Sequence, residues 1–363
     1  MQNTAISSRN IGCLIALSSI SSLLMTGSGK IGQDMWLAVI AATVFAVPLV
    51  LMYARIAKLN PGLNLYEMAC QNLGNAAGSI ITALLSWFAL HISALVTQNF
   101  TEFVVTISLE NTPKVFIIMG MIAVGGFLAG TNFNVMGRWS VIILIIVSGN
   151  LFVTLLLSLP SVNFSNLKPV MEHGLPEILS TGFSFGAIAF AETVLALVAF
   201  GSAEEKARPY KAYAFGIGYS AVMLLSVVMR NATVLGREMA ATTVFPTYVT
   251  ARIVSPSAFV EHIESIVSLN LILIGITKVS ICIRASAMGV AKLLRMADIK
   301  KLIVPVSLLS VAVCVASFSN MKELILFVDA YRFYVIPFTI IIPAAIWTGS
   351  EWRKRNKKKN GMT

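Results

Sequence analysis

About ten apolar runs, each long enough to cross a bilayer as a helix, constrain this chain more than any other feature. A helix that crosses the hydrocarbon core needs roughly 20 mostly apolar residues. Only helices and closed barrels satisfy every backbone amide in lipid. The runs therefore predict an all-α polytopic membrane protein. We place the expected spans at residues 11–28, 35–54, 78–106, 114–131, 139–159, 178–201, 212–229, 259–290, 302–318 and 331–348.

The composition supports a membrane protein and argues against a soluble one. Hydrophobic residues make up 57% of the chain and charged residues 12%, and the mean hydropathy is +0.82. A soluble domain has about a quarter of its residues charged. We take residues 1–350 as a single integral membrane domain and interpret the first run as a span, not a cleaved signal.

The net charge of +11 is explained by membrane topology, so we expect no nucleic-acid partner. Much of this charge lies in "WRKRNKKKN", after the last apolar run, and residues 351–363 are expected to form a basic tail. Lys and Arg accumulate on the cytoplasmic side of membrane proteins. With an even number of spans, this bias places both termini in the cytoplasm.

The two halves of the chain, 11–159 and 178–348, have a similar layout of five spans each. Because five is odd, the second half must start from the opposite side of the membrane, which makes the two repeats inverted. Inverted repeats whose first helices are broken are typical of transporters. The long connections 161–177 and 231–257 can each hold a short helix over the outer mouth.

Small polar residues interrupt the first span of each half. The first contains "SSISS", Ser18 to Ser22, and the sixth contains "FSFGAIA", Phe183 to Ala189. Ser and Gly weaken a helix, and a cavity or ligand can satisfy the amides that are freed. Two breaks at mid-membrane would suit a carboxylate ligand. The alternative is close helix packing through small residues.

Two charged residues lie inside the expected spans. Glu192 follows the second break by about one turn, and Lys278 lies near the middle of the eighth span. Such residues usually face a cavity or a charged partner. Glu192 is either a proton or ligand contact or, the interpretation we favour, a carboxylate that braces the half-helix against a neighbour. Lys278 needs carbonyls, hydroxyls or a carboxylate around it, and can serve as a fixed cation where related architectures bind sodium.

The sequence offers no support for an enzyme, a cofactor or a metal site. It contains no glycine-rich nucleotide loop, zinc signature or nucleophile motif. Its four cysteines are far apart and are interpreted as packing residues.

Five short stretches resemble the B subunits of bacterial spore germinant receptors, within the amino acid, polyamine and organocation transporter superfamily. They are "GQDMWLA" at 32–38, "NLYEMA" at 64–69, "NLKPVMEHG" at 166–174, "FAETVLAL" at 190–197 and "EHIES" at 261–265. The resemblance covers about residues 11–350. It implies a ten-helix, LeuT-like fold of five plus five helices, with helices 1 and 6 unwound around a small-molecule site.

The resemblance also implies site residues and partners. The pocket would take Ser21, Ser22, Leu23, Phe88, Ile92, Gly186, Ala189, Phe190 and Lys278. The protein would act in the inner membrane of the spore, with an A subunit and a lipoprotein C subunit, and would bind a germinant that is expected to be an amino acid.

Three functions stay open at this point. The leading one is a nutrient-sensing receptor subunit that triggers germination, and the second is an amino-acid permease with Glu192 as the candidate residue for proton coupling. The third is a structural or ion-conducting subunit whose polar path is lined by Lys278 and Glu192.

Overall fold

The computed structural model describes residues 5–28, 31–254, 263–318 and 321–359, and its regular elements in these ranges are helical. The helices are α1 (Ser8–Ile20), α2 (Met35–Leu59), α3 (Leu65–Leu73), α4 (Asn75–Ile107), α5 (Lys114–Ala129), α6 (Phe133–Ser158), α7 (Gly174–Ala189), α8 (Pro209–Thr242), α9 (Pro246–Val254), α10 (Ile263–Leu293), α11 (Lys300–Ser317), α12 (Met321–Tyr334) and α13 (Ile342–Lys359). Shorter 3-10 segments are η1 (Ser21–Ser28), η2 (Gly32–Asp34), η3 (Leu159–Ser161), η4 (Phe164–Leu167) and η5 (Ala191–Ser202), and η6 (Pro337–Ile341) is a π-helical turn.

The helices agree with the predicted membrane spans. Eight helical segments of the described ranges are long and apolar enough to cross a membrane. Two shorter apolar helices, Ser8–Leu24 and Lys114–Ala129, coincide with the expected first and fourth spans. The chain is therefore a multi-pass integral membrane protein.

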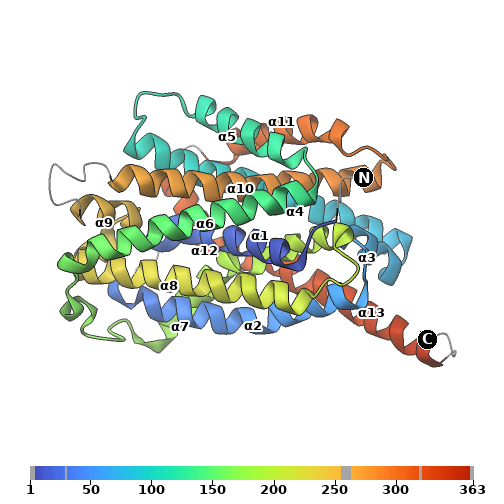
Figure 1. Ribbon diagram of the computed structural model, residues 1–363, viewed down its shortest axis with the longest axis horizontal. Coiled ribbons are helices and arrows are strands. Elements are labelled where there is room, and N and C mark those ends of the chain that lie inside the picture. The colour runs from blue at the N-terminus through green and yellow to red at the C-terminus, as the bar shows by residue number, and fades with distance from the viewer. Residues whose placement is uncertain (1–4, 29–30, 255–262, 319–320, 360–363) are drawn as a thin grey trace.

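The two halves of the chain contact one another reciprocally (Figure 1). Helix α1 packs on α8 and α2 packs on α7, so the first helix of each half contacts the second of the other. The third helices, α4 and α10, pack together, and each also contacts the fourth helix of the opposite half. This exchange is the contact pattern that two inverted five-helix repeats produce.

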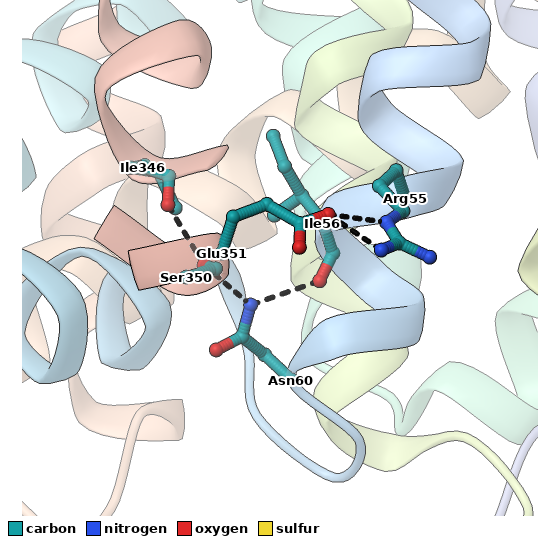
Figure 2. A network of polar contacts seen from close by, with 6 residues as sticks. All are labelled: Arg55, Ile56, Asn60, Ile346, Ser350 and Glu351. Carbon is teal, nitrogen blue, oxygen red and sulfur yellow. Dashed lines mark hydrogen bonds and ion pairs between the residues drawn. The ribbon is translucent and has the colours of Figure 1, made fainter. Parts of the chain in front are cut away.

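The first and last described segments lie at one end of the bundle, which we call the terminal end. The Ile6 N–H donates to Ser202 O at 2.8 Å, where η5 ends. Helix α13 is attached to the end of α2, as Figure 2 shows. There Arg55 Nε donates to Glu351 Oε1 at 2.6 Å, and Asn60 Nδ2 donates to Ser350 Oγ at 2.9 Å. These bonds fix the last helix against the first repeat.

At the opposite end, η2 is tied to the connection between the repeats. Asp34, which is fully buried, accepts the Met171 N–H at 2.9 Å. Gln33 Nε2 donates to Glu172 Oε2 at 2.6 Å, and Arg237 pairs with Glu172. The carboxyl groups of Asp34 and Glu172 therefore hold this connection on α8 and η2.

The structure corrects several expected boundaries. Helix α8 extends to Thr242, past the predicted end at 229, and a kink at Gly236, whose φ of 71° is not helical, divides it into two parts. The short helix α3 was missed, although Asn64 and Glu67 form the capping box that starts it. The expected short helices over the opposite end are α9 and the 3-10 turn η4. The predicted start of the eighth span at 259, and Glu261, lie outside the described residues.

Candidate functional site

The first span changes from an α-helix to a 3-10 helix inside the serine cluster. Helix α1 ends at Ile20 and η1 begins at Ser21. The Ser21 hydroxyl donates to Ser18 O at 2.7 Å, and the Ser22 hydroxyl donates to Ser19 O at 2.7 Å. Both hydroxyls thus satisfy carbonyls where the α-helical hydrogen-bond pattern stops. The first span is therefore interrupted within "SSISS", where the sequence predicted it.

The second interruption lies one residue beyond the predicted stretch. Residues 183–189 are α-helical, and the change to 3-10 structure occurs at Phe190, between α7 and η5. Gly182 and Gly186 lie against α2; a Cβ on Gly182 would come within 2.9 Å of Ala38 O, while one on Gly186 would make ordinary contact with Ala42. The small residues of this stretch therefore serve close helix packing.

Two buried tyrosines place their hydroxyls against backbone carbonyls just after the second interruption. Tyr53 of α2 places its hydroxyl 3.2 Å from Ala191 O and 2.6 Å from Thr339 O. Tyr213 of α8 donates to Thr193 O at 3.1 Å. An unpaired buried carbonyl would cost about 1–3 kcal/mol. The Tyr213 hydroxyl therefore stabilises η5, which has 12 residues, and the Tyr53 hydroxyl lies between η5 and η6, closer to η6.

A small cavity, with a volume of about 50 Å³, lies beside both interruptions. Its walls come from η1, α4, the end of α7, η5, α10 and α12. The lining residues are Ser21, Ser22, Ile92, Leu95, Val96, Asn99, Phe100, Ile188, Glu192, Lys278, Leu324, Phe327, Val328 and Tyr331. We call this space the central cavity. Most of its surface is apolar, and its polar groups are gathered at the interruptions.

Glu192 and Lys278 form an ion pair at the floor of the central cavity. Lys278 Nζ lies 2.6 Å from Glu192 Oε2, and both side chains are buried. The Tyr331 hydroxyl donates to the other carboxylate oxygen, Oε1. A smaller cavity, lined by Leu14, Ser18, Leu195, Ala196, Ile281 and Cys282, also touches both charged residues. The ion pair therefore separates the central cavity from a space nearer the terminal end.

The structure brings together five of the residues singled out from the sequence. Ser21, Ser22, Ile92, Glu192 and Lys278 all line the central cavity.

The other five lie elsewhere. Leu23 lines a different cavity on the far side of η1. Phe88 stacks on Phe338, with ring centroids 4.4 Å apart, and Gly186 packs on α2. Ala189 and Phe190 are buried at the junction of α7 and η5 without lining the central cavity.

Sequence reasoning missed the contribution of α12 and of the second half of α4. The residues from α12 are Leu324, Phe327, Val328 and Tyr331, spaced three or four apart so that they share one helix face. From α4, Leu95, Val96 and Asn99 continue the face that Ile92 begins. Two features of the sequence could have pointed to these residues: a polar residue, Asn99, inside an apolar span, and the aromatic residues Phe327 and Tyr331 of α12.

Solved membrane transporters share the fold of this chain. Mhp1, a nucleobase-cation-symport-1 family transporter with bromovinylhydantoin bound, matches with a TM-score of 0.62 at 14% identity, over 93% of this chain and 77% of Mhp1. MhsT in complex with L-phenylalanine matches with a TM-score of 0.64 at 8% identity, over 94% of this chain and 97% of MhsT. The fold is therefore LeuT-like, as predicted.

By sequence, the chain belongs to the spore germination protein family, whose model matches residues 5–322. Spore germination protein KB of Bacillus subtilis (strain 168) is 23% identical over 368 residues, which is 99% of this chain and 98% of that protein. Spore germination protein YndE of the same organism is 22% identical over 334 residues, 90% of this chain and 89% of that protein. The family resemblance predicted from the five motifs is confirmed.

Proposed function

We propose that this protein is the nutrient-sensing subunit of a spore germinant receptor and that it binds an amino acid in the central cavity. The observation that carries the proposal is the Lys278–Glu192 pair, buried in the lining of a mostly apolar cavity beside two helix interruptions. Family membership supports a role in germination, and the LeuT-like fold supports a small-molecule site at this depth.

The groups around the central cavity suit an amino acid with an apolar side chain. Lys278 Nζ carries three N–H donors, and within the described ranges it makes an ion pair with Glu192 alone, so donors are left for a ligand carboxylate. The hydroxyl oxygens of Ser21 and Ser22, and the carboxylate of Glu192, can accept from a ligand ammonium group. Ile92, Leu95, Phe327 and their apolar neighbours would hold the ligand side chain.

Sensing requires that the ligand bind one conformation better than another, because equal affinity shifts no equilibrium. Elements η1 and η5 are the natural parts to move, since both line the central cavity and neither is regular α-helix. In this proposal an A subunit and a lipoprotein C subunit read the change in the inner membrane of the spore. Both termini of this subunit face the cytoplasm, in keeping with its basic tail.

The second candidate is an amino-acid permease, favoured by the likeness of the fold to transporters. The two functions differ in whether binding leads to net movement of the ligand. Full-length protein in liposomes is offered labelled amino acids with and without a proton gradient. Accumulation against a gradient without partner subunits supports the permease and overturns the sensor.

The sensor has its own test in spores. Receptors that differ only in this subunit are exchanged between otherwise identical spores, and germination is measured against single amino acids. The sensor predicts that the amino-acid preference follows the subunit. An unchanged preference, with receptor levels equal, contradicts it.

A further inference from the structure

Arg230 is a buried cation that has no carboxylate partner among the described residues. It belongs to α8, its exposed fraction is 4%, and its contacts are all neutral. Nη1 donates to Thr154 Oγ1 at 3.2 Å, and Nη2 donates to Asn231 Oδ1 at 3.0 Å and to Thr247 O at 3.2 Å. The Nε group is buried and has no acceptor. Three of the five guanidinium donors are therefore used, and the positive charge is left unbalanced.

The surroundings of Arg230 add positive potential. Thr247 is in the first turn of α9, and the N-terminus of a helix carries the positive end of its dipole. Arg284 shows a different arrangement for a buried arginine. It donates to the carbonyls of Ala129 and Thr131 at the C-terminus of α5, and its guanidinium lies 4.5 Å from the ring centroid of Phe133. A helix C-terminus and an aromatic face both favour a cation, and Arg230 has neither.

Arg230 lines a cavity on the other side of η1 from the central cavity. Its volume is about 30 Å³, so a ligand larger than a water molecule fits only when the apolar side chains of the lining move apart. The apolar lining residues are Ile20, Leu23, Val147, Leu151, Met223, Val227, Val267, Leu271 and Ile274. The polar ones are Thr154, Arg230, Thr247 and Asn270.

The polar residues of this cavity are arranged to donate hydrogen bonds. Thr247 Oγ1 accepts from Asn231 Nδ2 at 3.1 Å, which leaves the hydroxyl hydrogen available. Asn270 Oδ1 accepts from Asn150 Nδ2 at 2.8 Å, which occupies the acceptor of this amide and leaves its N–H groups. No acidic residue is among the lining residues. The cavity thus offers a cation and donors at one side and hydrocarbon elsewhere.

From this geometry we propose a second ligand site, centred on Arg230, for a small monocarboxylate with an apolar body. The carboxylate balances the charge of Arg230 and accepts from Thr247 and Asn270, while the hydrocarbon part contacts Val227, Val267 and their neighbours. A free amino acid fits poorly, because its ammonium group would meet no acid. Element η1 is a common wall of both cavities, since its residues Ser21 and Ser22 line one and its residue Leu23 lines the other.

Thermal unfolding of the full-length protein in lipid nanodiscs, in chloride-free buffer, tests this site. Isobutyrate is the probe, isobutyramide is its neutral isostere, and chloride is the simple anion. Ligands that bind the folded state raise the midpoint of unfolding. We expect isobutyrate to raise the unfolding midpoint saturably and isobutyramide to raise it little. In Arg230→Gln the apparent affinity for isobutyrate should be at least tenfold weaker. Arg252→Gln, which removes an exposed arginine of α9, is the matched control and keeps the wild-type response.

A cavity-filling variant covers the case in which Arg230→Gln fails to fold. Val267→Phe retains the cation but occupies the space, and we expect it to lose the response to isobutyrate. The proposal is overturned if isobutyrate gives no rise, if isobutyramide acts equally well, if only chloride acts, or if Val267→Phe responds as the wild type does. Because Arg230 does not line the central cavity, none of these results depends on the proposed sensing of amino acids.

Discussion

Lys278 and Glu192 form a buried ion pair, with Nζ 2.6 Å from Oε2, between an α-helix and the 3-10 part of the sixth span. The pair joins the two structural features that the sequence singled out separately, an intramembrane lysine and an intramembrane glutamate. It also lies between the central cavity and a smaller one, so the stability of the fold and the proposed ligand binding involve the same two side chains.

Removing one member of this pair should destabilise the protein more than removing both. Lys278→Met leaves a buried carboxylate and Glu192→Gln leaves a buried ammonium, and an uncompensated buried charge costs about 3–5 kcal/mol. The double variant contains no such charge and should unfold closer to the wild type than either single variant does. The check is the unfolding midpoint in nanodiscs of the wild type, the two single variants and the double variant. Strictly additive effects of the two substitutions would contradict the pairing.

The tyrosines behind the second interruption should be needed for stability. Tyr53→Phe and Tyr213→Phe each remove a hydroxyl that satisfies a buried carbonyl, with an expected loss of about 1–3 kcal/mol. Tyr210→Phe, at a half-exposed position on α8, should leave the unfolding midpoint unchanged. If all three variants unfold together with the wild type, these hydroxyls do not support η5.

Asp34 should control the order of the connection between the repeats. Asp34→Ala removes the acceptor of the Met171 N–H and the partner of His173, whose Nδ1 lies 3.3 Å from Asp34 Oδ2. We expect faster cleavage by chymotrypsin after Phe164, which is 70% exposed in the same connection. Asp298→Ala, which changes an exposed aspartate near the start of α11, is the control and should be cleaved there at the wild-type rate. Equal rates for all three proteins would show that the connection is held by other contacts.

The spans and the first interruption could be predicted because each rests on a local property of the chain. Apolar runs determine where helices cross, and the hydroxyls of Ser21 and Ser22 act on carbonyls three residues earlier. The need of Lys278 for a partner followed from the cost of a buried charge. Its partner Glu192 could not be identified in this way, since the pairing depends on how α10 lies against η5.

The second interruption and most of the cavity lining depend on tertiary packing. Gly186 appeared to weaken a helix, yet it lies on Ala42 of α2 and the helix continues past it. Phe88 was expected at the cavity but stacks on Phe338, because it lies on the same face of α4 as Ile92 but one turn beyond the cavity. Helix α4 is apolar around much of its circumference, so the sequence does not show which of its residues reach the cavity.

Equilibrium binding of labelled amino acids to the full-length protein in nanodiscs tests the central claim most directly. Val328→Trp places a large side chain in the lining of the central cavity, and Leu326→Trp places one on an exposed part of the same helix. We predict saturable binding of at least one apolar amino acid to the wild type and to Leu326→Trp, with an affinity at least tenfold weaker in Val328→Trp, a loss of about 1.4 kcal/mol or more. Absence of binding to the wild type, or equal affinity in Val328→Trp, would contradict the account.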